Sequence, residues 1–274
     1  MTLTIGTGPF GEQGDKTFNF QVQAPRDHVL YFEDSPRQVR VMLGGETVAD
    51  SRRAKLLHET GHLPVYYFPK EDVRAELLEE SGHTTHCPFK GEASYWTVKA
   101  GEKVAENAVW GYPDPIDSAP PLAGYVAFYW NKMDAWYEED EEVFVHPRDP
   151  YHRVDILQSS RHLRVRVNGV LVAETERPKV LFETGLPPRY YIPKEDVRQD
   201  VLLKSEKRTR CPYKGVASYW SVEAGAERFD DLVWYYPDPI PEAAKIEGLL
   251  AFFNEKVDLE VNDEIQERPR TQWS

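Results

Sequence analysis

Two nine-residue stretches decide the architecture of this chain: Tyr66-Tyr67-Phe68-Pro69-Lys70-Glu71-Asp72-Val73-Arg74 and, 124 residues later, Tyr190-Tyr191-Ile192-Pro193-Lys194-Glu195-Asp196-Val197-Arg198. The same shift aligns the chain with itself without a gap from Val39–Asp134 to Leu163–Asp258. A period this long that occurs only twice is typical of tandem domains rather than of a solenoid of small units. We therefore predict two diverged copies of one β-rich domain of about 120 residues.

The boundaries of the copies follow from where this correspondence begins and ends. Pro25-Arg26-Asp27 recurs as Pro147-Arg148-Asp149, with a spacing two residues shorter than the 124-residue shift of the gapless part. Each copy therefore starts before its gapless part. The expected organisation is an arm at 1–24, a first repeat at 25–145 and a second repeat at 146–274, with a polar tail from about 259.

The composition favours a mainly β fold. Hydrophobic residues make up 41% of the chain and aromatic residues 12%, which is enough to bury a core in each copy. Large rings suit pleated sheets and aromatic-lined pockets better than helical bundles. The 21 prolines and 17 glycines indicate many short elements joined by turns.

Turn and helix signals place the elements within each copy. Alternating apolar residues flank Gly44-Gly45 in the first copy and Asn168-Gly169 in the second, and such pairs tolerate the two positive φ values of a tight hairpin. Pro69 and Pro193 each begin a short helix with acidic residues in its first turn, where the helix dipole favours them. We predict that each copy is a twisted antiparallel sheet carrying this one short helix. Further strands are expected at 56–59, 65–68, 95–98, 109–110 and 124–129.

The charge and the cysteine count exclude several classes of partner. A formal charge of −13 argues against nucleic acid, since a phosphate backbone requires a basic face, and against anionic membranes. No run of apolar residues is long enough to span a membrane, and the first residues lack the pattern of a signal peptide. Two cysteines fit a reducing cytoplasm, where we expect this protein. The acidic run Glu138-Glu139-Asp140-Glu141-Glu142, near the junction, is interpreted as a solvated linker edge.

Two further segments are shared by the copies and carry a family resemblance. Cys87-Pro88-Phe89-Lys90-Gly91 recurs as Cys211-Pro212-Tyr213-Lys214-Gly215, and each continues after one residue with Ala-Ser-Tyr-Trp. Trp110-x-Tyr112-Pro113-Asp114-Pro115-Ile116 recurs as Trp234-x-Tyr236-Pro237-Asp238-Pro239-Ile240. Together with the opening pair, these segments resemble domain-of-unknown-function family 427 over both copies and nearly the whole chain.

The resemblance implies a β-tent-like fold, similar to that of methionine sulfoxide reductase B and of cereblon's ligand-binding domain. It supplies no established catalytic residues. The family is sometimes labelled nucleotidyltransferase, but the chain has no Gly-Ser followed by a spaced Asp-x-Asp for a metal-bound nucleotide. Many β-tent proteins hold zinc with two Cys-x-x-Cys pairs, whereas each copy here has one cysteine. We therefore expect neither that zinc nor another cofactor.

Three motifs suggest metal or nucleotide sites, and a simpler interpretation is favoured for each. His58-Glu59-Thr60-Gly61-His62 spells the His-Glu-x-x-His of zinc proteases, but the glycine and the following Leu63-Pro64 argue against the helix that this chemistry needs. Gly6-x-Gly8-x-x-Gly11 matches the dinucleotide fingerprint without its strand and helix, so a flexible arm is favoured. His83-x-x-His86-Cys87 could supply three metal ligands in the first copy only, and solvated loop histidines are the alternative.

The shared Cys-Pro-x-Lys-Gly segment is the strongest candidate for chemistry. A thiol becomes a nucleophile when a nearby cation stabilises its thiolate, and the lysine lies three residues away. A buried, inert cysteine beside a solvated lysine is the alternative. A glutamate kept in both copies beside variable neighbours suggests a hydrogen-bonded structural or site role. The candidate catalytic residues are Cys87, Glu59 and Lys90, with Cys211, Glu183 and Lys214 in the second copy.

Recurring aromatic residues could line a ligand cleft beside these groups. Adjacent side chains on a strand face opposite sides, so Tyr95 and Trp96 cannot both enter one core. A cleft and ordinary packing explain the rings equally well. The candidate ligand-binding residues are Arg53, Tyr66, Tyr95, Trp96, Trp110 and Tyr112, and in the second copy Arg177, Tyr190, Tyr219, Trp220, Trp234 and Tyr236.

Two functional hypotheses follow. In the first, each copy forms an aromatic-walled pocket for a small polar metabolite, and an enzyme uses the thiol, carboxylate and amine there. In the second, the chain is a non-catalytic module for ligand sensing or protein interaction. Duplication fits the second hypothesis because two pockets raise the effective concentration for a bivalent partner. The sequence identifies neither the substrate nor a protein partner.

Overall fold

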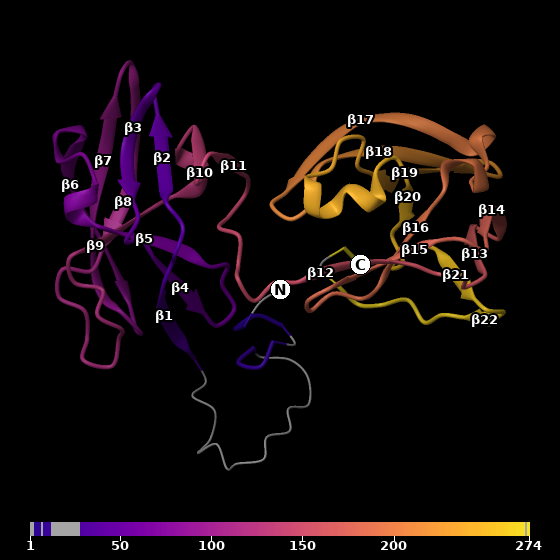
Figure 1. The fold of residues 1–274 in the computed structure, drawn as a ribbon, viewed down its shortest axis with the longest axis horizontal. Helices are drawn as coiled ribbons and strands as arrows, with labels where there is room; N and C mark the ends of the chain where they lie inside the picture. The colour runs from indigo at the N-terminus through magenta and orange to yellow at the C-terminus, as the bar shows by residue number, and fades with distance from the viewer. Residues whose placement is uncertain (1–2, 7, 12–27, 272) are drawn as a thin grey trace, which may run out of the picture. The chain divides into compact units, whose positions relative to one another are not determined.

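Strands make up most of both repeats, which confirms the mainly β prediction (Figure 1). The chain divides into two units, Met1–Asp149 and Pro150–Ser274. Each unit contains one seven-stranded and one four-stranded antiparallel sheet, where a single twisted sheet was expected. This computed structural model describes residues 3–6, 8–11, 28–271 and 273–274.

The first repeat pairs strands that are distant in sequence. Its seven-stranded sheet contains, in spatial order, β1 (Leu30–Asp34), β4 (Lys55–Glu59), β5 (Val65–Pro69), β9 (Tyr125–Phe128), β8 (Lys103–Gly111), β7 (Gly91–Ala100) and β6 (Leu78–Cys87). Its four-stranded sheet contains β11 (Glu141–Val143), β10 (Ala135–Glu138), β2 (Val39–Leu43) and β3 (Glu46–Ser51).

The second repeat has the same strand order. Its seven-stranded sheet contains β12 (Val154–Gln158), β15 (Lys179–Glu183), β16 (Arg189–Ile192), β20 (Leu250–Phe252), β19 (Glu227–Tyr235), β18 (Gly215–Ala224) and β17 (Leu202–Cys211). Its four-stranded sheet contains β14 (Val170–Thr175), β13 (Leu163–Val167), β21 (Asp258–Val261) and β22 (Glu264–Ile265). The duplication read from the sequence is therefore a duplication of topology.

The predicted hairpins are present in both repeats. Gly44 and Gly45 connect β2 to β3 with φ values of 59° and 79°, and Asn168 and Gly169 connect β13 to β14 with 48° and 75°. A Cβ on Gly44 would lie 2.0 Å from the carbonyl oxygen of Ala100, so only glycine fits there. Both turns have the paired positive φ values of tight hairpins that match the twist of the strands.

The short helices predicted after Pro69 and Pro193 are single 3-10 turns, η1 (Lys70–Asp72) and η4 (Lys194–Asp196). Each ends at a valine with extended backbone, Val73 or Val197, which forms a β-bridge to the neighbouring hairpin. That bridge stops the turn from continuing as a helix. The remaining 3-10 helices are η2 (Ala75–Leu77), η3 (Trp130–Lys132), η5 (Gln199–Val201) and η6 (Pro241–Ile246).

Each seven-stranded sheet buries apolar side chains on both faces. One face packs against the four-stranded sheet and forms the main core, as with Phe68, Val109 and Trp136 in the first repeat. The opposite face, here called the outer face, carries a smaller cluster rich in tyrosine. In the first repeat the outer-face cluster includes Leu57, Tyr67, Ala93, Tyr95, Tyr112, Leu122 and Ala127, with Cys87 and Trp110 partly buried against it.

Two parts predicted to be solvated lie partly within the sheets, although residues 139–142 of the acidic run are exposed as expected. Glu138, from the acidic run interpreted as a linker edge, ends β10 at 6% exposure and accepts hydrogen bonds of 2.9 Å from the Tyr66 hydroxyl and the Arg37 guanidinium. The Arg148 N–H also donates to this carboxylate at 3.0 Å, and the three donors together satisfy the buried group. The tail expected from about residue 259 begins inside β21, because Leu259 and Val261 alternate into the core.

The predicted arm lies largely outside the described residues, as do Pro25-Arg26-Asp27 at the expected start of the first repeat. In its described part, the Thr4 hydroxyl donates a hydrogen bond of 3.2 Å to the carbonyl oxygen of Glu59. Among the described residues, no helix is both long and apolar enough to cross a membrane.

Candidate functional site

Three polar side chains form one edge of the outer face in the first repeat. Glu59, the last residue of β4, accepts a hydrogen bond from the Lys90 ammonium through Oε2, and its Oε1 lies 2.9 Å from Nε2 of His28. Phe89 stacks on the imidazole, with ring centroids 3.7 Å apart and an interplanar angle of 8°. Glu59 and Lys90 are buried, at 9% and 7% exposure. The carboxylate is therefore held between a cation and an imidazole that an aromatic ring covers.

The second repeat builds the same arrangement. The Lys214 ammonium donates to both carboxylate oxygens of Glu183, with N···O distances of 2.6 Å. Nε2 of His152 lies 3.0 Å from Oε1 of the same carboxylate, and Tyr213 stacks on the imidazole at a centroid distance of 3.9 Å. We call each set of three side chains the His–Glu–Lys cluster.

The His–Glu–Lys cluster keeps both glutamates ionised. Burial alone would raise the pKa of Glu183, but the charge of Lys214 and the hydrogen bond with His152 outweigh burial and lower it to about 2. The pKa of Glu59 is also lowered, because the hydrogen bond and charge of Lys90 outweigh burial. A carboxylate whose pKa lies this far below neutral pH is a weak proton acceptor.

A tight turn between β6 and β7 presents Lys90 to the cluster. The Lys90 N–H donates to the carbonyl oxygen of Cys87 at 3.3 Å, and Gly91 follows with φ +103°. A Cβ on Gly91 would lie 3.3 Å from the carbonyl oxygen of Asp114, which explains why glycine follows the lysine. Gly215 has φ +100° at the equivalent turn of the second repeat. The shared Cys-Pro-x-Lys-Gly segment therefore encodes a backbone shape that fixes the lysine.

The Tyr112 hydroxyl makes no hydrogen bond within the described part of the chain, although the residue is only 6% exposed. The same holds for Tyr236 at 4% exposure. Burial raises the pKa of Tyr112 above its usual range, and the nearby Tyr67, Cys87 and Glu59 raise it further. Two other outer-face phenols have partners: Tyr95 and Thr85 share a hydrogen bond of 2.9 Å, and Tyr191 accepts one of 3.0 Å from the Trp234 indole. Neither hydroxyl oxygen is among the fully buried unpaired atoms of the described residues, so each reaches the surface and is open to water or to a ligand.

Most of the predicted site residues do come together on the outer face. Tyr236 lies within electrostatic reach of Cys211, Glu183 and Tyr219, as Tyr112 lies near the equivalent groups. The Lys90 ammonium also lies 5.9 Å from the centre of the Tyr112 ring. The predicted residues on this face are Glu59, Cys87, Lys90, Tyr95, Trp110 and Tyr112, with Glu183, Cys211, Lys214, Tyr219, Trp234 and Tyr236 in the second repeat.

The other predicted ligand-binding residues of the first repeat lie elsewhere. Trp96 packs against the main core, and the Lys70 ammonium lies 5.0 Å from its ring centre. Tyr66 is in the same core, where its hydroxyl donates to Glu138. Arg53 is exposed and pairs with acidic residues of η1.

The equivalent residues of the second repeat are likewise off the outer face. Trp220 packs against the main core near Lys194, and the Tyr190 hydroxyl accepts a hydrogen bond of 3.1 Å from Arg161. Arg177 is exposed and pairs with Glu195 and Asp196. Because side chains alternate along a strand, only one residue of each neighbouring aromatic pair can lie on the outer face. The structure, not the sequence, shows which one does.

Two site residues were missed by the sequence reasoning, His28 and His152. They stand 124 residues apart, so the gapless alignment that was taken to begin at Val39 continues upstream to them. This 124-residue spacing is the feature of the sequence that could have identified the two histidines as equivalent residues. Tyr67 and Tyr191 also belong to the outer face, and the Tyr191 hydroxyl accepts a hydrogen bond of 3.0 Å from the Trp234 indole.

The repeats match a known family. Residues 31–139 and 155–263 each match the family described as domain of unknown function DUF427. The chain belongs to this family. It is a tandem DUF427 protein whose two domains both carry aromatic clusters. No curated protein sequence matches the chain.

The metal motifs read from the sequence do not assemble in the first DUF427 repeat. His58 lies in strand β4 rather than on a helix, and its Nε2 is 2.8 Å from a carboxylate oxygen of Glu33. His83 contacts the ring of Tyr95, whereas His86 pairs with Glu92. Across the described ranges, no group of three or more His, Cys, Asp or Glu side chains is arranged to hold a metal ion.

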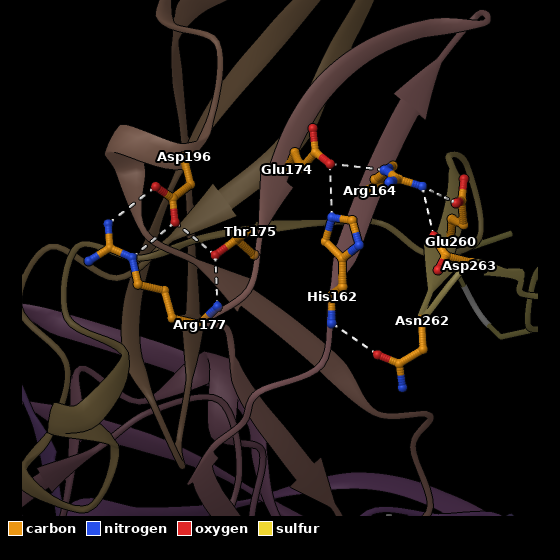
Figure 2. A network of polar contacts seen from close by, with 9 residues as sticks. All are labelled: His162, Arg164, Glu174, Thr175, Arg177, Asp196, Glu260, Asn262 and Asp263. Atoms are coloured by element: carbon orange, nitrogen blue, oxygen red, sulfur yellow. Dashed lines mark hydrogen bonds and ion pairs between the residues drawn. The ribbon is translucent and has the colours of Figure 1, made fainter.

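A polar hollow of about 560 Å³ lies in the second DUF427 repeat and is lined by His162, Glu174, Thr175, Glu176, Arg177 and Asp196. Figure 2 shows that its charged groups pair with one another: His162 with Glu174, and Arg177 with Asp196. The paired side chains are 21% to 57% exposed, and their ion pairs are of the weak surface type. The hollow includes the predicted residue Arg177 but carries no aromatic wall, so the outer face is the stronger candidate.

Proposed function

We propose that each DUF427 repeat binds a small polar metabolite on its outer face. The Tyr112 or Tyr236 hydroxyl would donate a hydrogen bond to an oxygen of the ligand. Lys90 or Lys214 would add positive charge, and the neighbouring rings would provide apolar walls. Pockets of this kind combine apolar lining with a few placed polar groups.

The unpaired hydroxyl is the observation that carries this proposal. Phenols are protonated at neutral pH, so both hydroxyls keep a donor available, and burial, which raises their pKa, extends that state to more alkaline pH. An ammonium has three donors, so Lys90 retains capacity beyond its bond to Glu59. These donors favour a ligand that carries a carbonyl, carboxylate or phosphate oxygen.

The state of the glutamates favours binding over acid–base catalysis. Both oxygens of Glu59 and of Glu183 are already engaged by the His–Glu–Lys cluster. Their lowered pKa values make them weak bases, so we assign them the role of orienting the lysine. The hypothesis that Cys87 and Cys211 act as nucleophiles is then the catalytic alternative, since both thiols are half-buried at the cluster.

Saturation-transfer NMR with a panel of small hydroxy acids, sugar phosphates and nucleosides tests the binding proposal. We expect signals from oxygen-rich members of the panel and their loss in the double variant Tyr112→Phe/Tyr236→Phe. Tyr137→Phe, on β10 of the four-stranded sheet, is the matched control and should retain them. Absence of any signal at millimolar ligand, or equal signals in all three proteins, would refute the proposal.

Thiol labelling separates binding from catalysis. If the thiols only line the site, iodoacetamide should modify Cys87 and Cys211 slowly at neutral pH. Fast labelling at pH 6, followed at each cysteine by peptide mass spectrometry, would instead support the nucleophile hypothesis.

A further inference from the structure

The second repeat has a segment packed beside its outer-face site. This closing segment runs from Arg268 to Ser274, of which every residue except 272 is described. Arg268 pairs with Asp258 at 2.6 Å, and the Ser274 hydroxyl accepts a hydrogen bond of 2.9 Å from the Thr271 backbone. The segment is therefore folded into a turn and tied to β21.

A buried ion pair anchors the closing segment. The Arg189 guanidinium donates two hydrogen bonds to Glu255, at 2.8 and 2.6 Å, and these side chains are 5% and 0% exposed. The Thr271 hydroxyl donates a third hydrogen bond of 2.6 Å to the same carboxylate. These donors outweigh the burial of Glu255 and lower its pKa. The bidentate geometry fixes the plane of the guanidinium.

The anchored guanidinium links the segment to the site. Its carbon lies 5.7 Å from the ring centre of Trp234 and 5.4 Å from that of Trp273. Trp234 belongs to the outer-face cluster, and its indole donates to the Tyr191 hydroxyl. The contacts thus run from Trp273 through Arg189 to the aromatic wall of the site.

The described part of the first repeat has no equivalent of this segment and its ion pair. Val65 stands in the position of Arg189, and Asn131 stands in that of Glu255. Trp110, the equivalent of Trp234, is half-buried rather than buried, and its neighbour Tyr129 is 37% exposed. In the part of the chain that the structure describes, the two sites share their polar groups and differ along this edge.

We propose that the closing segment is a built-in cover for the site of the second repeat, and that the first repeat holds the more open site. This inference rests on the proposed binding function and adds its regulation. The cover is held by a few side-chain contacts at the edge of the domain, so it opens without unfolding of the sheets. A ligand entering the second site displaces Trp273 from Arg189 and therefore binds more weakly than in the first.

Fluorine NMR of the full chain labelled with 5-fluorotryptophan tests the cover without any ligand. Relaxation by a soluble gadolinium chelate reports the exposure of each indole, and Trp-to-Phe variants assign the signals. We expect Trp110 to relax faster than Trp234 in the wild type. In Trp273→Ala the relaxation enhancement of Trp234 should rise about twofold or more, since its edge is uncovered.

Thr271→Val is the milder variant. It removes the hydrogen bond that the Thr271 hydroxyl donates to Glu255 and the one that it accepts from the Trp273 backbone, and it should shift Trp234 in the same direction. Trp220, on the opposite face of the sheet, should not change in either variant. An unchanged Trp234 signal in both variants overturns the cover. A ligand from the panel that occupies one site per chain in the wild type and two sites per chain in Trp273→Ala supports the cover. If no ligand binds either protein, the proposed function fails while the fluorine result still decides the cover.

Discussion

Replacing Glu183 with glutamine should destabilise the second repeat by about 3 kcal/mol, because it leaves the Lys214 ammonium buried without a carboxylate. The side chains of Glu183 and Lys214 are 7% and 9% exposed, so water cannot replace the lost charge. Removing one partner of a buried ion pair typically costs about 3–5 kcal/mol. A loss of this size lowers the melting temperature of a domain this size by about 10 °C.

The pH dependence gives an independent measure of the same interaction. The pKa of Glu183 is lowered from 4.5 to about 2, and each unit corresponds to about 1.4 kcal/mol, which again gives about 3 kcal/mol. Because the folded pKa is the lower one, this stabilisation is complete above pH 4.5 and disappears as the pH falls towards 2. In Glu183→Gln that contribution to the acid dependence should be missing.

Urea unfolding followed by tryptophan fluorescence and circular dichroism measures both effects. The curves should be fitted with separate transitions, because each repeat has its own core. Glu223→Gln, on the exposed face of β18, is the matched control and should change the free energy of unfolding by less than about 0.5 kcal/mol. A change below about 1 kcal/mol for Glu183→Gln, with unaltered acid dependence, would refute the account of the His–Glu–Lys cluster.

Three further predictions follow from particular contacts. Gly215→Ala should destabilise the second repeat by about 1–3 kcal/mol in urea unfolding, since φ is +100° and the new Cβ would lie 3.3 Å from the Ile240 nitrogen. Gly225→Ala should lose less stability, because φ is +68° but no atom lies within 4 Å of the new Cβ; equal losses of stability in the two variants would contradict the steric reason. Tyr66→Phe should destabilise the first repeat by about 1–3 kcal/mol, because Glu138 loses a buried donor, and an unchanged denaturation midpoint would argue against that contact. In an alkaline titration followed by ultraviolet absorbance, Tyr112 and Tyr236 should stay protonated until the protein unfolds, because their pKa values are raised; their ionisation near pH 10 in the folded state would show that they are not buried.

Much of the fold was predictable because local and global signals agree. The turns at Gly44-Gly45 and Asn168-Gly169 identify their hairpins through the positive φ values that they permit, and the 124-residue shift transfers each element to the second repeat. The second sheet of each repeat was not predicted. Its strands β10 and β21 come from acidic or terminal segments whose burial depends on partners far away in sequence.

The candidate site was only partly predictable for a related reason. Alternation shows that Tyr95 and Trp96 face opposite sides, but not which side faces the four-stranded sheet, and Trp96 proved to be on the core side. His28 contacts Glu59 across 31 residues, and no local pattern indicates such a contact. The cover over the second site depends on the contact between Arg189 and Glu255. A comparison of the two repeats shows that both residues differ from their equivalents in the first copy, but it does not show that they form an ion pair.

Crystallographic screening with small oxygen-rich fragments tests the central claim most directly. The account predicts a fragment whose oxygen lies within about 3 Å of the Tyr112 hydroxyl, with Cys87 and Lys90 beside it. In Trp273→Ala, a second copy should occupy the equivalent place at Tyr236. Fragments found only elsewhere, with both hydroxyls sealed inside solid packing, would contradict the claim.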